Sequence, residues 1–124
     1  MHSPSPDQSD WQAMNLHFQA QPQLLDRLIG MLSDTLNGIQ QELSQAIASQ
    51  NFNELDKVAH NLKGTALNLH TPELARLAIQ TQEQARQRAG DALETAQTLS
   101  QCLSDFLKHL DQRQTNSSTG DCAQ

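Results

Sequence analysis

Apolar residues recur along this chain at intervals of three and four, which is the period of one face of an α-helix. A short stretch places Trp11, Met14 and Phe18 on one side, and four longer apolar stripes follow at residues 25–47, 55–69, 74–85 and 93–110. No segment alternates between apolar and polar residues at period two, so no strand is expected. The pattern predicts an all-α fold, namely an antiparallel up-down four-helix bundle with an additional short N-terminal helix.

Helix-capping residues precede several of these stripes. Asp10 can cap the short helix, and Asn53 can cap the helix that carries the stripe at 55–69. Thr71 is followed by Pro72, an order typical of an N-cap and a first helical residue. These signals support the division of the chain into separate helices.

The two ends of the sequence lack an apolar stripe. Residues 1–9 contain the two prolines of SPSP, and residues 114–124 (QTNSSTGDCAQ) are small and polar. Both ends are expected to be disordered tails. The remaining residues, 10–113, are expected to form a single helical domain.

Composition narrows the possible functions. The chain has 124 residues with three Phe, one Trp and no Tyr, so Leu, Ile and Ala must form the core. Its net charge of −6 argues against nucleic acid or an anionic membrane surface as a partner. No apolar run is long enough to span a membrane, no signal peptide is visible, and Cys102 and Cys122 do not suggest a disulfide framework. We therefore expect a cytoplasmic monomer.

The helix that carries the stripe at 55–69 has an unusual outer face. At about 100° per residue, His60, Gly64 and Leu67 point away from the core, and Lys57 and Lys63 flank them. A glycine inside a helix costs about 1 kcal/mol relative to alanine, so some function should offset this cost. An exposed leucine beside a missing side chain is typical of a surface onto which another protein docks.

The helix that follows can be aligned with this one by counting residues back from the turn near His70. Antiparallel neighbours rise equally per residue, which places His60 at the level of Thr81 and Gln82. Ile79, Gln82 and Arg86 form a row outside the core stripe. If this row faces the same side as His60, Gln82 can reach the imidazole, and Ile79 and Arg86 extend the surface.

The segment AHNLKGTALNL, residues 59–69, resembles the signature A-H-x-L-K-G of the histidine-containing phosphotransfer (HPt) domain family. The similarity extends from about residue 24 to 110. The resemblance implies a four-helix bundle that carries phosphoryl groups between aspartates of receiver domains. It implies that His60 is the phosphoacceptor, that Lys63 assists, that Gly64 permits close approach and that Gln82 orients the ring. This chain departs from the family pattern at His70, where a glycine is usual, and at Thr81, where leucine is frequent.

The expected chemistry requires an accessible imidazole nitrogen, and positioning and charge stabilisation supply most of the catalysis of phosphoryl transfer. The sequence contains no glycine-rich phosphate loop, acidic metal cluster or ATP site, so no cofactor of its own is expected. Magnesium would come from the partner receiver domain. On this interpretation the protein is a relay intermediate without ATP-dependent kinase activity. Its partners are response-regulator receiver domains, and a hybrid sensor kinase is a further candidate partner.

Two alternatives stay open. One is a helical adaptor that has kept the bundle and lost the relay, which the intact His60 and Lys63 argue against. The other is the phosphoacceptor fragment of a sensor histidine kinase. Such fragments usually have an acidic residue directly after the histidine and a proline soon after, whereas Asn61 follows here and the next proline is Pro72. The other histidines, including His17 and His109, are interpreted as having no role in the relay. The sequence does not indicate which receivers are served, the direction of phosphate flow, or whether the domain belongs to a larger kinase.

Overall fold

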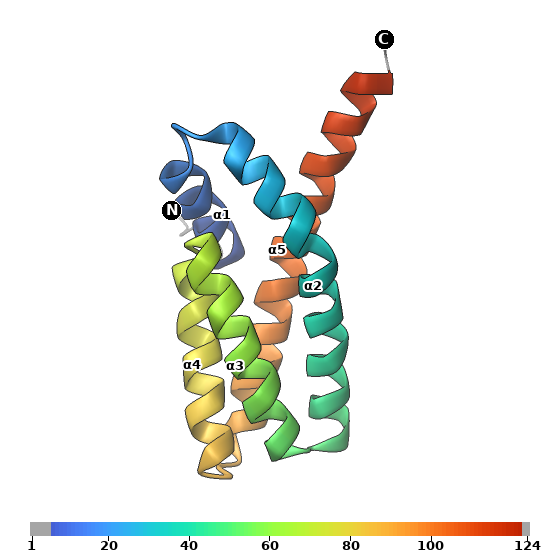
Figure 1. Ribbon diagram of the computed structural model, residues 1–124. Helices are drawn as coiled ribbons and strands as arrows, with labels where there is room; N and C mark the ends of the chain where they lie inside the picture. The colour runs from blue at the N-terminus through green and yellow to red at the C-terminus, as the bar shows by residue number, and fades with distance from the viewer. Residues whose placement is uncertain (1–5, 123–124) are drawn as a thin grey trace, which may run out of the picture.

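The computed structural model describes residues 6–122, which form five α-helices (Figure 1). Their bounds are α1 Pro6–His17, α2 Pro22–Ser49, α3 Phe52–Leu69, α4 Pro72–Arg86 and α5 Asp91–Cys122. Helices α2 to α5 run alternately down and up, and each packs against two others of the four. No strand occurs in the described part of the chain. The predicted four-helix bundle with a short N-terminal helix is confirmed.

The core follows the apolar stripes of the sequence. On α3 the buried residues are Leu55, Val58, Ala59, Leu62, Ala66 and Leu69. The seam on α5 is likewise buried, and its Phe106 is among the largest fully buried side chains. None of the helices in residues 6–122 is long and apolar enough to cross a membrane.

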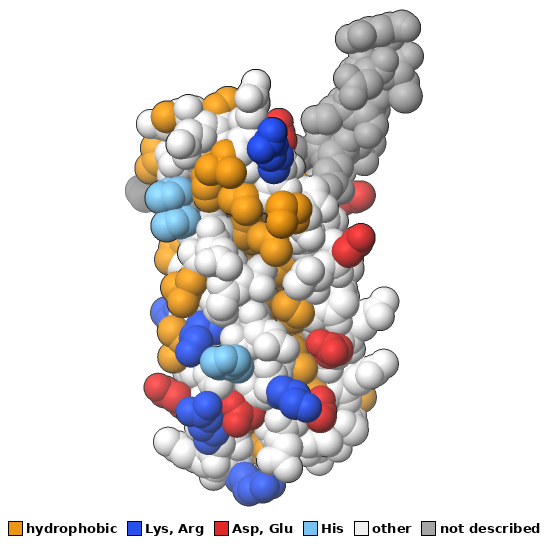
Figure 2. All heavy atoms as spheres, in the orientation of Figure 1, with side chains coloured by type: hydrophobic (Ala, Val, Ile, Leu, Met, Phe, Trp, Pro, Cys, Tyr) orange, Lys and Arg blue, Asp and Glu red, His pale blue; other side chains and the backbone are white. Residues whose placement is uncertain are grey.

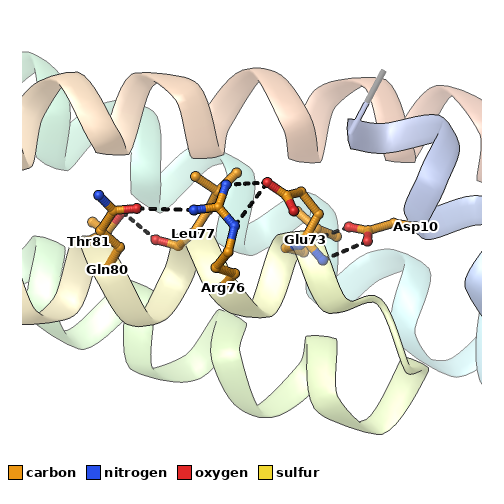
Figure 3. Close-up of polar contacts among 7 residues, drawn as sticks. Asp10, Glu73, Arg76, Leu77, Gln80 and Thr81 are labelled. Carbon is orange, nitrogen blue, oxygen red and sulfur yellow. Dashed lines mark hydrogen bonds and ion pairs between the residues drawn. The ribbon is translucent and has the colours of Figure 1, made fainter. Parts of the chain in front are cut away.

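A buried carboxylate on α1 caps α4 (Figure 3). Asp10 was expected to cap its own helix, but α1 begins at Pro6, so Asp10 lies inside α1. Its two oxygens accept hydrogen bonds from the backbone N–H groups of Glu73 (2.7 Å) and Leu74 (2.8 Å). Thr71 occupies the N-cap position, but its hydroxyl donates to the carbonyl of Ala66 at 3.1 Å. The side-chain cap of α4 therefore comes from another helix, and its negative charge adds to that of Glu73 in the first turn of α4.

Ring contacts also attach α1 to the bundle. Trp11 stacks on His109 of α5 with ring centroids 5.4 Å apart, and it meets Phe106 edge-on at 5.9 Å. At the other end of α1, His17 stacks on His70 with centroids 3.4 Å apart. His17 and His109, which the sequence left without a relay role, thus help to hold α1 over the end of the bundle.

His70 shows how this chain ends α3 without the glycine that is usual in related sequences. Its backbone is left-handed, with φ 59° and ψ 48°. Its N–H is directed to the carbonyls of Ala66 and Leu67, which closes the last turn of the helix. The departure from glycine at His70 therefore concerns the cap of α3. The imidazole of His70, which a glycine would not have, packs against His17.

Helix boundaries differ from the sequence expectations at three other places. Asn51, not Asn53, caps α3, and its side chain accepts from the N–H of Glu54 at 3.1 Å. The reason is that α2 ends at Ser49 and that a single residue in the left-handed conformation, Gln50, turns the chain toward α3.

The two ends of the chain also differ from the expectation. Helix α1 begins inside the segment expected to be a tail, because Pro6 suits a first helical turn. Helix α5 continues beyond 113 to Cys122, since no residue before Gly120 is a strong helix breaker. The rest of the expected tails, residues 1–5 and 123–124, lies outside the described residues.

Candidate functional site

The contact between His60 and Gln82 is the centre of the site. His60 is exposed on α3, and its Nδ1 lies 3.4 Å from Nε2 of Gln82 on α4. Gln82 is only 5% exposed, whereas the sequence placed it in an outer row. Its helix, α4, packs against both α3 and α5. The reach of Gln82 to the imidazole, expected from the helix register, is present.

The orientation of the Gln82 amide determines the proton position on the ring. As placed, the amide nitrogen faces Nδ1, an arrangement that suits the tautomer with an unprotonated Nδ1 and the proton on Nε2. Half a turn of the amide would present Oε1 instead, which accepts from a protonated Nδ1 and leaves a lone pair on Nε2. One buried amide can therefore stabilise either tautomer of an exposed histidine.

Beside Gln82, Thr81 is fully buried at the level of His60. Its hydroxyl donates to the carbonyl of Leu77, one turn earlier in α4, at 2.8 Å (Figure 3). The hydroxyl is thus satisfied within its own helix. The departure from leucine at this position affects packing and leaves the imidazole contact intact.

The three cations predicted near His60 have different environments. Lys63 is half-buried and forms no ion pair among the described residues. Lys57 is exposed and lies 4.0 Å from Glu54. Arg86, predicted to extend the surface, is exposed, and its Nε lies 3.3 Å from both carboxylate oxygens of Asp56. Lys63 is therefore the cation most available to a group on His60.

Asp56 is the site residue that the sequence reasoning missed. It precedes His60 by four residues on α3, and Arg86 follows Gln82 by four residues on α4. The helix register that pairs His60 with Gln82 also pairs Asp56 with Arg86. Extending the same count by one turn would have placed Asp56 at the level of Arg86.

Gly64 lies one turn after His60 on the exposed face of α3. A Cβ atom built on it would meet no other atom within 4 Å, and its φ is not positive. Neither packing nor backbone conformation therefore requires glycine here. The same open space surrounds Gly30 and Gly38 on α2, so openness alone does not indicate a function.

Leu67 and Ile79, the two apolar residues predicted outside the core, are 55% and 39% exposed. Leu67 also borders a pocket beside α1, lined by Ala13, His17, Ala66, His70, Thr71, Pro72 and Ala75. In Figure 2 hydrophobic side chains gather on the upper part of the face shown, and charged side chains of both signs surround a histidine on the lower part. An apolar area and a charged area thus share one face of the molecule.

Comparison with protein families agrees with this geometry. Residues 23–113 match the model of the Hpt domain, a range that covers helices α3 and α4 entirely and most of α2 and α5. The chain therefore belongs to the Hpt domain family, whose members carry out histidine phosphotransfer in two-component phosphorelays. Comparisons with curated proteins and with solved structures each give no significant match.

Proposed function

We propose that His60 accepts a phosphoryl group from the phosphorylated aspartate of one receiver domain and passes it to an aspartate of another. The observation that carries this proposal is the contact of exposed His60 with buried Gln82, one turn from Lys63, which has no ion pair within the described part of the chain. Phosphohistidine chemistry needs an accessible nitrogen on an oriented ring. The family supplies the general reaction, and this contact supports the choice of residue.

In the proposed transfer, the lone pair of Nε2 forms a bond to phosphorus while the bond from phosphorus to the aspartyl oxygen breaks. The aspartate leaves as a carboxylate, and the proton on Nδ1 stays on the ring. Gln82 assists by turning its Oε1 toward Nδ1–H, which stabilises the tautomer with a free Nε2. Transfer to the next receiver is the same step in reverse.

Lys63 is proposed to place positive charge near the phosphoryl oxygens. Developing negative charge in phosphoryl transfer is usually balanced by cations, including magnesium. Within the described residues, no group of three or more His, Cys, Asp or Glu side chains is arranged to hold a metal ion. We propose that magnesium and the reacting aspartate are both supplied by the receiver domain.

The receiver is proposed to dock on the surface formed by Lys57, Gly64, Leu67, Ile79 and Arg86. Leu67 and Ile79 supply exposed apolar contacts, and the open space at Gly64 lets the partner backbone approach His60. Lys57 and Arg86 border these residues and attract an acidic pocket. Such an interface should be small, because a relay protein must release one partner before it binds the next.

The direct test is label transfer to the wild-type protein and to His60→Gln. A receiver domain phosphorylated with labelled phosphate should transfer acid-labile label to the wild type, and the variant should receive none at unchanged helicity and melting temperature. His17→Gln is the matched control and should be labelled like the wild type. Persistent labelling of His60→Gln would contradict the assignment. Incubation with ATP alone should label neither protein, and labelling there would indicate a kinase.

A further inference from the structure

An ion pair bridges α3 and α4 one helical turn from the phosphoacceptor. Asp56 and Arg86 stand in the same register as His60 and Gln82, displaced by four residues on each helix. The two cross-helix contacts are therefore stacked about 6 Å apart along the helices. Arg86 Nε is equally close to both oxygens of the carboxylate, at 3.3 Å.

A carboxylate at this place opposes the proposed chemistry. A phosphoryl group on a protein side chain carries close to two negative charges at neutral pH. Asp56, one turn from His60, would repel it, and Arg86 neutralises that repulsion. The side chains of Asp56 and Arg86 are 32% and 61% exposed, so the pair itself adds little to folding stability. Stability alone is thus a weak reason for its presence.

We propose that Asp56 is a positioning residue that holds Arg86 beside His60 and releases it to the phosphoryl group when His60 is phosphorylated. This inference rests on the proposed phosphorylation of His60. A guanidinium binds phosphoryl oxygens with the same planar set of donors that it offers a carboxylate. The phosphoryl group carries more charge than Asp56 and lies one turn away, so the exchange needs only a side-chain movement.

Neither of the other two cations near this pair contacts Asp56 among the ion pairs of the described residues. Lys57 lies next to Asp56 in sequence but is directed toward Glu54, at 4.0 Å. Lys63 lies on the far side of His60, one turn along α3. Of these cations only Arg86 contacts Asp56, so it is the one whose position Asp56 controls.

The test uses phosphoramidate, a small phosphoryl donor, so that no receiver is required. NMR follows the Arg86 Nε–H signal and the ³¹P signal of the phosphorylated ring, which His60→Gln assigns by its loss. In the unphosphorylated proteins, Asp56→Asn should shift the Arg86 signal away from its wild-type position. After phosphorylation the wild-type and Asp56→Asn signals should coincide, because Arg86 then binds the phosphoryl group in both. The ³¹P titration should move down by about half a pH unit in Asp56→Asn and up by a similar amount in Arg86→Ala.

Asp105→Asn is the matched control, because it removes the same charge from an ion pair on α5. It should leave both signals at their wild-type values. The exchange would be overturned if the Arg86 signal still differed between the wild type and Asp56→Asn after phosphorylation and did not change when His60 is phosphorylated. If His60 reacts with phosphoramidate but with no phosphorylated receiver, the proposed relay function is contradicted. The NMR comparison still tests the exchange in that case, because it needs no receiver. If His60 takes up no phosphoryl group at all, both proposals are overturned.

Discussion

Gln82, almost fully buried on α4, places its amide nitrogen 3.4 Å from Nδ1 of the exposed His60 on α3. The proposed phosphoacceptor on the surface thus contacts a residue that is itself buried. The α3 and α4 helices pack closely along their length, so Gln82 has little freedom to move away. This relationship separates His60 from His17, whose only described partners are other rings.

Replacement of Gln82 should slow phosphotransfer without removing it. In Gln82→Ala the His60 ring loses its orienting contact, and misplacement of a reacting atom lowers the rate by roughly ten- to a hundredfold. Single-turnover transfer from a phosphorylated receiver measures this rate. Gln80→Ala is the control, because Gln80 is exposed on the same helix and does not contact His60. Equal rates for the two variants would remove Gln82 from the mechanism.

Gly64→Ala should have opposite effects on stability and on transfer. A Cβ meets no atom of the chain at this position, so helix stability should rise by a few tenths to about 1 kcal/mol. The added methyl group should slow transfer, because it occupies the space where the partner approaches. Gly30→Ala on α2 has the same open surroundings and should stabilise the protein without slowing transfer. Denaturant unfolding measures the stability and single-turnover kinetics measures the transfer rate. A Gly64→Ala variant with the wild-type transfer rate would contradict the proposed role of Gly64 in docking.

Asp10→Ala should destabilise the bundle and leave the chemistry unchanged. The substitution removes the acceptor of two N–H groups at the start of α4. Loss of such a cap, with α1 less firmly attached, should lower the free energy of unfolding by about 1–2 kcal/mol. Thr71→Val is an informative comparison, because the Thr71 hydroxyl bonds Ala66 and does not cap α4. A larger loss in Thr71→Val than in Asp10→Ala would show that the assignment of the cap is wrong.

The bundle was predictable because helical periodicity is a local property of the sequence. The stripe on α3 was read from spacing alone, and every member of it is buried. The role of Asp10 was not predictable, since its carboxylate meets residues more than sixty positions away. Spacing identifies an acidic residue near a helix start, but it does not indicate which helix that residue caps.

The site was partly predictable for the same reason. The level of Gln82 follows from counting residues around one short turn, so its contact with His60 could be expected. Its burial could not, because the angle between α3 and α4 decides which side of the row is enclosed. The pairing of Arg86 with Asp56 required both the register and the side-chain direction, and only the first can be counted.

Aspartate at either exposed apolar position near His60 should weaken receiver binding. Leu67 and Ile79 are each more than a third exposed, so Leu67→Asp and Ile79→Asp should leave the bundle folded. Each substitution removes an apolar contact, and the new carboxylate repels the acidic pocket of the receiver. Leu16→Asp on α1 is the control, since Leu16 is exposed outside the proposed surface. Receiver titration followed by chemical shifts tests the surface, and perturbed amides clustered on α2 and α5 instead would contradict it.

Reversal of the charge at Lys57 should slow association more than it alters the bound complex. Lys57 is 74% exposed, and its ion pair with Glu54 is long, at 4.0 Å. Its charge therefore acts mainly on an approaching partner. Long-range attraction of this kind is screened by salt over about 10 Å at 0.1 M ionic strength. Lys57→Glu should therefore reduce the association rate strongly at low salt and weakly at high salt in stopped-flow measurements. Lys108→Glu on α5 is the matched control, because Lys108 is similarly exposed and has a similar partner, Asp105 at 3.8 Å. If both variants slow association equally, net charge is responsible and Lys57 has no special place in the encounter.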